Sequence, residues 1–432
     1  MTAAAEAAPR GVGTGAGLLY AAGSLGTGVF STVPTILLLY YCTETLAIPP
    51  AWAAAAVAIP KVWSILWDPF VGALSDRTYT RFGRRRPFLV LGGLGVFAAF
   101  IAVFSTPVLA PLNAFIWVSV AYFALATTYS LFAVPYIAVP AELGRTESER
   151  GRMVTMRITG AMIGLLAGAA LAPMLVAQGG GGRAGYGFMA VIIAALCLAA
   201  MFGPVIMLKG REAVRASAAS QGPSLIRQLK TAFAHHQFRL LALSYFLQLT
   251  ATGAISALTP YVVTGLLGRA EGDIGIAMGV MLIVTILATP LLGWLGGRFG
   301  NRVVLALGAL AYAAASAALG MSLLRGGDWN AALIGFGLMG APLAAVQVLP
   351  FVLMAHLAHA ESRDGASLEG VFTGVWTASE KLGLALGPAV AGLVLALTRE
   401  NVSQAASVLL IGASPILFVL SLAPLLGFKR PA

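Results

Sequence analysis

Charged residues are scarce in this 432-residue chain, where Asp, Glu, Lys and Arg together make up 10% of the sequence. A water-soluble domain carries about 25% charged residues. Because 59% of the residues are hydrophobic, a soluble fold of this length would have too little interior to bury its apolar surface. The shortage of charge therefore excludes an ordinary soluble domain and favours a membrane protein.

Cysteine is nearly absent as well. Cys42 and Cys197 are the two cysteines of the chain, and they lie in or at the ends of apolar runs. They lack the spacing of a metal or redox site, and we expect no disulfide between them. The chain also lacks G-x-S-x-G, P-loop and H-E-x-x-H motifs. We therefore expect no enzyme activity, no metal and no cofactor, and a protein driven by ion or solute gradients rather than by ATP.

Acidic residues are fewer than basic residues, 16 against 27, which gives a net charge of +11. Such an excess is typical of nucleic-acid-binding proteins. The cytoplasmic loops of membrane proteins collect Lys and Arg in the same way. In a chain this apolar, we interpret the charge as loop arginine and expect no nucleic-acid partner.

Long apolar runs are what the sequence has in abundance. A helix needs about 20 residues to cross the hydrocarbon of a bilayer, and its backbone groups must pair within the segment there. The sequence therefore predicts an all-α, multi-pass membrane protein. The runs predict twelve transmembrane helices, near residues 16–41, 51–75, 86–106, 111–139, 154–178, 185–208, 237–265, 273–296, 302–324, 330–358, 370–397 and 401–427.

The longest polar break lies between the sixth and seventh runs. It predicts a six-helix bundle over residues 1–208, a cytoplasmic linker over 209–236 and a second six-helix bundle over 237–432. The two halves share the pattern R-F-G-x-R in the loops that follow spans 2 and 8, and spans 5 and 11 each carry a cation followed by glycines. Parallel six-helix repeats of this kind are typical of alternating-access transporters, with the site at the interface of the repeats.

Lys and Arg are distributed unevenly over the loops. Twenty of the 27 fall on one side of the membrane, four fall on the other side, and three lie inside spans. By the positive-inside rule, this distribution places both termini and the linker in the cytoplasm. We expect the protein in an inner (plasma) membrane of the bacterial type.

Several ionisable residues fall within the predicted spans. Such a side chain is costly at bilayer depth and generally lines a cavity or meets a partner. Asp68 lies mid-span beside Pro69 and is the candidate site of a coupling cation. Arg157 and Lys381 are candidates to bind a substrate or to pair with Asp68. For Asp68 the alternative is a structural hydrogen bond between helices, and for Lys61 it is snorkelling toward the membrane surface.

A second group of polar residues lies at the cytoplasmic ends of the spans. We expect Asp76 to pair with a loop arginine, and the alternative is a solvated surface charge. We expect Glu142 to form a gating salt bridge with Arg150 or Arg152, and the alternative is contact with the substrate. His356 and His359 share one helix face, which suits a proton switch, or else a wet helix end. The predicted gating and loop residues are Asp76, Arg77, Arg84, Arg85, Glu142, Arg152, His356 and His359.

Four segments resemble one known family. WDPFVGALSDRTYTRFGRRRPF in the second span resembles the second-helix signature of the glycoside–pentoside–hexuronide:cation symporter family (melibiose permease-like) of the major facilitator superfamily. VPYIAVPAEL, ESERGRMVTMR and GVFTGVWTASEKLGLALG resemble segments at matching places. The resemblance implies the major facilitator fold with two six-helix bundles, and cation-coupled transport by alternating access. It also implies that Asp68 joins the cation site, that Arg157 contacts sugar and that Lys381 lies near the cation.

The chain departs from the family pattern at three carboxylates, whose places are taken by Ser24, Ser64 and Ala133. A sodium ion needs several oxygen ligands to offset its desolvation, whereas a proton needs one titratable group. We therefore predict a coupling site formed by Asp68 with Ser64 and Ser24, and we expect a proton rather than sodium as the coupling ion.

The predicted substrate-binding residues are Arg157, Lys381, Tyr136, Trp376 and Glu380. This set is more cationic than the family norm, which favours a small solute that is sugar-like or anionic. The predicted function is symport of such a solute by a monomeric transport unit in the lipid bilayer. The alternatives are an exporter of amphiphiles or drugs, an uncoupled facilitator, and a membrane assembly factor of the same fold that transports nothing.

Overall fold

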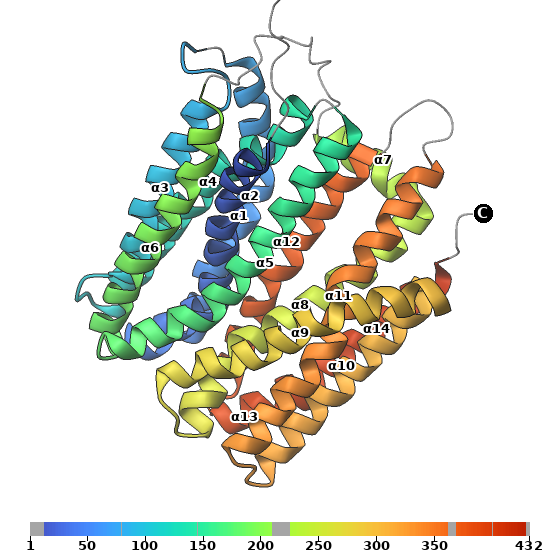
Figure 1. The fold of residues 1–432 in the computed structure, drawn as a ribbon. Helices are drawn as coiled ribbons and strands as arrows, with labels where there is room; N and C mark the ends of the chain where they lie inside the picture. The colour runs from blue at the N-terminus through green and yellow to red at the C-terminus, as the bar shows by residue number, and fades with distance from the viewer. Residues whose placement is uncertain are drawn as a thin grey trace, which may run out of the picture.

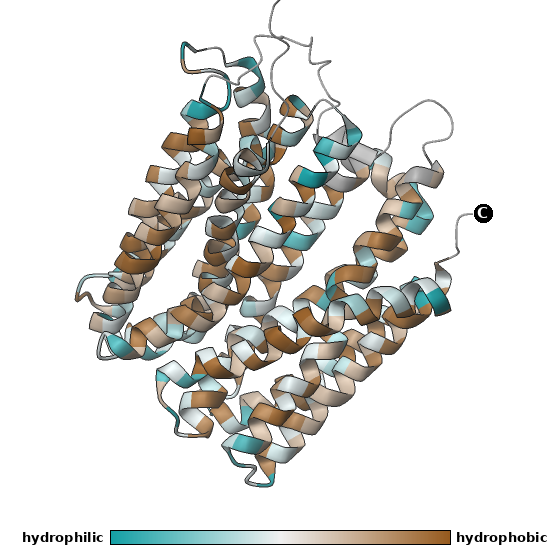
Figure 2. Ribbon diagram, viewed as in Figure 1, coloured by the Kyte–Doolittle hydropathy of each residue, from teal (hydrophilic) through white to brown (hydrophobic). Residues whose placement is uncertain are grey.

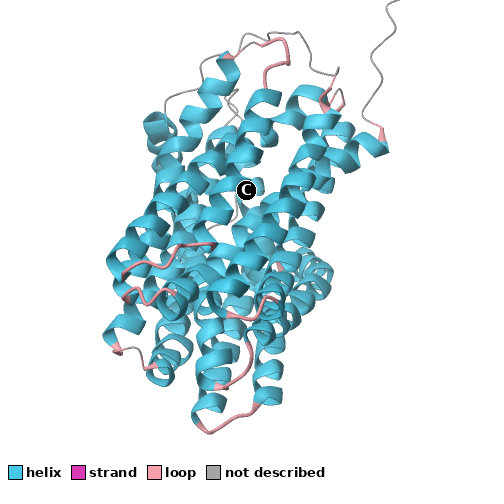
Figure 3. Cartoon of the chain, turned by 90° about the vertical axis from the view of Figure 1, so that its left-hand side faces the viewer, coloured by secondary structure: helices cyan, strands magenta, loops and turns pink. Residues whose placement is uncertain are grey.

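The protein is described by a computed structural model that covers residues 13–78, 80–144, 146–209, 225–361, 369–399 and 401–428. Over these ranges the chain is built of helices joined by short loops, without a strand (Figure 3). Twelve segments within them are long and apolar enough to cross a membrane. The predicted all-α class and the predicted number of spans are therefore confirmed.

Blue to green helices form the first bundle in Figure 1, and yellow to red helices form the second. The first bundle consists of α1 (Thr14–Val33), η1 (Pro34–Leu38), η2 (Tyr41–Thr45), α2 (Pro50–Arg77), α3 (Arg86–Phe104), α4 (Pro111–Leu143), α5 (Glu147–Gln178) and α6 (Gly182–Met207). The second consists of α8 (His236–Tyr261), η3 (Val262–Leu266), α9 (Glu271–Phe299), α10 (Asn301–Leu324), α11 (Trp329–Glu361), α12 (Glu369–Leu397), α13 (Val402–Ser407), η5 (Val408–Ala413) and α14 (Ser414–Gly427). The η segments are π-helical turns that continue their neighbouring α-helices.

Most helix ends lie within a few residues of the predicted ones, and the largest difference has a local cause. The fifth span was predicted to begin at 154, but α5 begins at Glu147. Thr146 caps this helix, because its side chain accepts a hydrogen bond from the Glu149 amide at 3.1 Å. A threonine followed three residues later by glutamate is a capping-box sequence.

The predicted linker is partly helical. Residues 225–234 form α7 (Leu225–Ala234), which contacts α8 and α12. Residues 210–224 lie outside the described ranges. The exact boundaries of the two predicted bundles and the linker remain a prediction.

The surface agrees with a lipid environment. Many large apolar side chains are exposed on the outer faces, such as Leu287 (73% exposed) and Ile59 (61%). Figure 2 shows apolar residues along the length of the helices and hydrophilic residues gathered in the end loops. In water these faces would be unfavourable, whereas lipid chains cover them at no cost.

The repeated R-F-G-x-R pattern has a repeated backbone conformation. Gly83, between α2 and α3, has φ of 93°, and Gly300, between α9 and α10, has φ of 94°. A positive φ of this size favours glycine over residues with a side chain. The same turn therefore reverses the chain at matching places in the two halves.

Glycines also pack matching helices together in each half. A Cβ atom at Gly160 of α5 would lie 2.5 Å from the Ala21 carbonyl oxygen of α1. A Cβ atom at Gly387 of α12 would lie 2.6 Å from the Gly253 backbone of α8. Span 5 thus packs on span 1 as span 11 packs on span 7, and the glycines allow the close approach.

We call the end of the molecule that carries the α2–α3 loop the arginine end, and the other end the opposite end. One apolar core includes residues of both bundles, from Ala16 to Phe418. A second core, from Ala232 to Phe428, lies within the arginine-end half of the second bundle. The bundles share their core toward the opposite end, where α2 meets α12 and α5 meets α9. This arrangement indicates a conformation that is closed at the opposite end.

Candidate functional site

An ion pair connects the two bundles at mid-depth. The Nζ atom of Lys381 on α12 donates a hydrogen bond to Oδ2 of Asp68 on α2. The two side chains are 26% and 22% exposed, so the pair lies at the edge of the packed interface. Asp68 was expected to pair with Lys381 or with Arg157, and Lys381 is the partner.

The second oxygen of Asp68 is unusual. Oδ1 is buried and has no hydrogen-bond partner among the described residues. A buried carboxylate oxygen without a partner is costly, and either a proton or a metal cation would satisfy it. The predicted role of Asp68 at the coupling ion remains a prediction.

Arg157 and Glu380 lie on the two sides of the same interface. Glu380 of α12 interacts electrostatically with Lys381 and with Arg157 of α5. Tyr129 of α4 interacts with Asp68, Arg157 and Glu380 in the same way. Lys381 contacts Asp68, and Arg157 and Glu380 lie within electrostatic reach of the pair and of Tyr129, a residue that the sequence analysis missed.

Ser24 and Tyr136 form a hydrogen bond between α1 and α4. The Tyr136 hydroxyl donates to the Tyr20 carbonyl oxygen at 2.6 Å and lies 2.7 Å from the Ser24 hydroxyl. Ser24 and Tyr136 are both 1% exposed. In this conformation the two side chains hold the first bundle together, and their predicted roles at the cation and the substrate remain predictions.

Ser64 lies one helical turn before Asp68. Its hydroxyl donates to the Lys61 carbonyl oxygen at 2.7 Å, within α2. Ser64 and Ser24 thus both use their hydroxyls away from Asp68. Their predicted participation in a cation site remains a prediction.

Trp376 is packed rather than facing an open space. The residue is fully buried and stacks on Tyr245, with ring centroids 4.6 Å apart. Phe351 and Phe238 contact the same ring at 5.8 Å and 6.4 Å. In this conformation Trp376 belongs to the second core, and its predicted contact with a substrate remains a prediction.

Lys61 is a connection between the bundles that the sequence analysis did not assign to the site. Its Nζ atom donates to the Thr35 hydroxyl in η1 and to the Leu384 carbonyl oxygen in α12, both at 3.1 Å. Pro388 follows Leu384 by four residues and has no N–H group, so the Leu384 carbonyl lacks its usual helical donor. In the sequence, Pro388 was the feature that could have indicated a carbonyl group without a helical donor in span 11.

The predicted loop arginines meet two acids at the arginine end of the first bundle. Arg85 Nη2 lies 2.6 Å from both Asp76 Oδ1 and Glu142 Oε1. Arg84 pairs with Glu142 and lies 3.7 Å from Asp76. Asp76 thus has the expected arginine partners, and Glu142 binds Arg84 and Arg85 instead of the expected residues of α5.

These contacts tie α2, the following loop and α4 within one bundle. Arg150 uses its Nε atom to donate to the Gly144 carbonyl oxygen at 2.9 Å. The remaining predicted loop residues Arg77, Arg152 and His356 are exposed. The side chain of His359 lies outside the described part of the chain. A state-dependent lock at this end remains a prediction.

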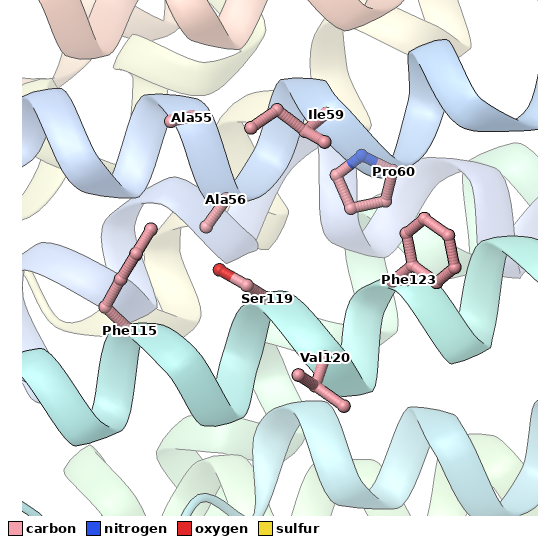
Figure 4. Close-up of a pocket in the computed structure, with 8 residues that line it drawn as sticks. All are labelled: Ala55, Ala56, Ile59, Pro60, Phe115, Ser119, Val120 and Phe123. Atoms are coloured by element: carbon pink, nitrogen blue, oxygen red, sulfur yellow. The ribbon is translucent and has the colours of Figure 1, made fainter.

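A cavity of about 310 Å³ lies elsewhere, between α2 and α4 (Figure 4). Its lining is apolar apart from Ser119, and Ile59 and Val120 are exposed on the outer surface. None of the intramembrane charged residues lines it. Its position on the outer face separates it from the site around Asp68.

Comparisons with known proteins agree with this architecture. The MFS/sugar transport protein family matches residues 19–427. The isoprimeverose transporter of Lactiplantibacillus pentosus is 24% identical and aligns over 93% of this chain and 84% of that protein. The uncharacterized symporter YnaJ of Bacillus subtilis (strain 168) is 32% identical, over 37% of this chain and 34% of that protein.

The solved structures confirm the fold. The crystal structure of a D-xylose-proton symporter superposes with a TM-score of 0.68 at 16% identity, and covers 97% of this chain and 98% of that chain. Twelve apolar helices, two connected bundles and a family match over nearly the whole sequence lead to the same conclusion. The chain is a multi-pass membrane protein that belongs to the MFS/sugar transport protein family, the glycoside–pentoside–hexuronide:cation symporters of the major facilitator superfamily.

Proposed function

We propose that the protein is a secondary active symporter that moves a small polar solute, sugar-like or anionic, together with a proton. The observation that carries the proposal is the Asp68–Lys381 pair, which joins the bundles and leaves one Asp68 oxygen buried without a partner. The family membership and the similarity to the isoprimeverose transporter of Lactiplantibacillus pentosus support a sugar-like solute. Arg157 and Lys381 support an anionic group on that solute.

The coupling of proton and solute transport follows from the charge of Asp68. An ionised Asp68 holds the Lys381 ammonium, and the pair stabilises the contact between α2 and α12. A proton on Asp68 removes the negative charge, so the carboxyl group loses most of its attraction for the ammonium. Lys381 is then free to bind the solute, and the bundles are free to rearrange.

The conformation fits one stage of this cycle. If the arginine end faces the cytoplasm of a bacterial inner membrane, closure at the opposite end makes this the inward-facing stage. Solute and proton leave toward the cytoplasm, the ion pair re-forms, and the bundles rock to expose the site to the other side. Glu380, near both Arg157 and Lys381, offsets their charge while the site is empty.

The test is uptake into proteoliposomes under an imposed pH gradient or an imposed sodium gradient. Sugars, uronides and organic acids would be screened as solutes. We expect proton-driven uptake that Asp68→Asn lowers at least about tenfold, because the coupling proton loses its acceptor. Asp273→Asn is the matched control, since Asp273 pairs with Arg269 in the loop at the opposite end of α9.

Each other outcome selects an alternative. Uptake driven by sodium would show that the site binds a metal ion despite its single carboxylate. Uptake that needs no gradient and survives Asp68→Asn would identify an uncoupled facilitator with a structural Asp68. Efflux of amphiphiles would identify an exporter, and no transport of any solute would favour an assembly factor.

A further inference from the structure

Two Tyr-x-x-Thr segments occupy matching places in the two halves of the chain. Tyr40-Tyr41-Cys42-Thr43 lies at the end of the first span, and Tyr261-Val262-Val263-Thr264 lies at the end of the seventh. The first and seventh spans are the first helices of the two six-helix bundles. Each segment contains or adjoins a π-helical turn, a feature frequent at functional sites.

The two segments bind each other reciprocally. The hydroxyls of Thr43 and Tyr261 lie 2.7 Å apart, and those of Thr264 and Tyr40 lie 3.0 Å apart. Each tyrosine thus uses the threonine of the other bundle. The two tyrosine rings also touch edge-on, with centroids 5.1 Å apart and an interplanar angle of 75°.

This contact is buried at the closed end of the molecule. Tyr40 is 8% exposed and Tyr261 is 2% exposed, and both belong to the core that the bundles share. A buried hydroxyl without a partner is costly, so the four hydroxyls stabilise the closed arrangement only while they pair. Separation of the first and seventh spans breaks both bonds and the ring contact together.

We propose that Tyr40, Thr43, Tyr261 and Thr264 form a symmetrical clasp, and that they are positioning residues of the transport cycle because they hold the opposite end closed. The inference rests on the alternating access of the proposed function. The clasp opens when the site turns to the other side of the membrane. Since each bond joins a tyrosine of one bundle to a threonine of the other, the loss of either one favours opening.

The chain contains its own reporter of this opening. Cys42 lies between Tyr40 and Thr43, is fully buried, and lies near Tyr261 of the other bundle. Its thiol becomes reactive only when the two bundles separate at this end. Cys197 is buried inside the first bundle, where its carbonyl oxygen lies against Gly26. A Cys197→Ala background leaves Cys42 as the single thiol of the chain.

The experiment measures the rate at which a maleimide alkylates Cys42 in purified protein in detergent, where both ends are accessible. Tyr40→Phe and Tyr261→Phe remove one hydroxyl each and keep the rings. We expect each to raise the rate about two- to tenfold, the effect of losing one neutral hydrogen bond. The double variant Thr43→Val with Tyr261→Phe should label no faster than Tyr261→Phe, because both changes remove the same bond.

Tyr41→Phe is the matched control. The Tyr41 hydroxyl accepts a bond from the Thr106 amide at 3.2 Å, within the first bundle, and Tyr41 is the direct neighbour of Cys42. We expect no change in the labelling rate for this variant. If a Tyr40 variant fails to fold by size-exclusion chromatography, Thr264→Val removes the same bond from the other side.

Two results overturn the clasp: unchanged labelling in both Tyr40→Phe and Tyr261→Phe, or an equal rise in Tyr41→Phe. The second result would mean that the first bundle merely loosens around Cys42. The measurement needs neither solute nor gradient. A wrong solute or coupling ion in the proposed function therefore leaves the labelling rates interpretable, and a failed clasp leaves the uptake assay valid.

Discussion

At the scale of the residue, the central feature is the Asp68 carboxylate, which has a protein partner on one of its two oxygens. Lys381 binds one oxygen of Asp68, and the other is buried without a partner among the described residues. A structural ion pair would normally satisfy both oxygens with further donors. Oδ1 is therefore the Asp68 atom to which the proton of the proposed mechanism would bind.

The pair also makes a prediction about stability. Lys381→Met leaves the Asp68 carboxylate without its cation, and we expect it to destabilise the fold by about 1–3 kcal/mol. Adding Asp68→Asn removes the unpaired charge and should recover part of that loss. Thermal unfolding of both variants in one detergent measures the difference.

The control for this prediction is the pair between Arg269, whose side chain is 44% exposed, and Asp273, four residues later at the opposite end. Its loss should change stability by less than about 1 kcal/mol. A double variant of Asp68 and Lys381 that is no more stable than Lys381→Met would contradict a direct interaction between the two.

The site shows what single residues reveal without a structure. Asp68, Arg157 and Lys381 stand out in the sequence because charge inside an apolar run is costly, and the structure brings Lys381 to Asp68. Tyr129 did not stand out. Lys61 stood out as a charge inside a span, but its contact could not be predicted, because its acceptor lies more than 300 residues away, at Leu384.

At the scale of the element, glycine positions decide how closely helices pack. Gly387→Ala would place a Cβ atom 2.6 Å from the Gly253 backbone, so α12 and α8 must move apart. We expect a lower melting temperature, because the helices lose close contact. Thermal unfolding of the variant protein in detergent checks this.

Gly293→Ala in α9 is the control, because no atom lies within 4 Å of the added Cβ. Alanine is about 1 kcal/mol better than glycine inside a helix, so this variant should be as stable as the unchanged protein or more stable. A melting temperature that falls equally in both variants would mean that the close packing of α12 on α8 at Gly387 does not determine the stability.

Most elements could be predicted from the sequence because each membrane span must satisfy its own backbone. The run lengths therefore predict the number of helices, and Thr146 explains the one early start. The helix α7 was missed because it lies in a polar break that carries no apolar run. The π-helical turns were missed because they depend on packing between spans rather than on composition.

At the scale of the whole molecule, the loop charges predict orientation. Twenty of 27 Lys and Arg residues lie on the side that includes the linker. We expect a fluorescent protein fused after the C-terminus to fold and fluoresce in the cytoplasm. We expect alkaline phosphatase inserted in the α5–α6 loop near Gly180 to be active in the periplasm.

The reverse pattern of reporter activity would mean that the protein has the opposite orientation in the membrane. The conformation described above would then face outward, and the clasp would close the cytoplasmic side. Fluorescence at the C-terminus combined with an inactive phosphatase near Gly180 would instead indicate that α5 and α6 do not both span the membrane.

The contact of Lys381 with Asp68 has a consequence for the proton gradient of a cell. Under the proposed mechanism, a carrier that returned with a proton but no solute would leak the proton gradient at every turn. Lys381 already occupies one oxygen of Asp68 from within the protein, so a proton has to compete with a cation that cannot diffuse away. The ion pair would then slow the return of a protonated carrier without solute, and a transporter that lacks solute would leak few protons across the membrane.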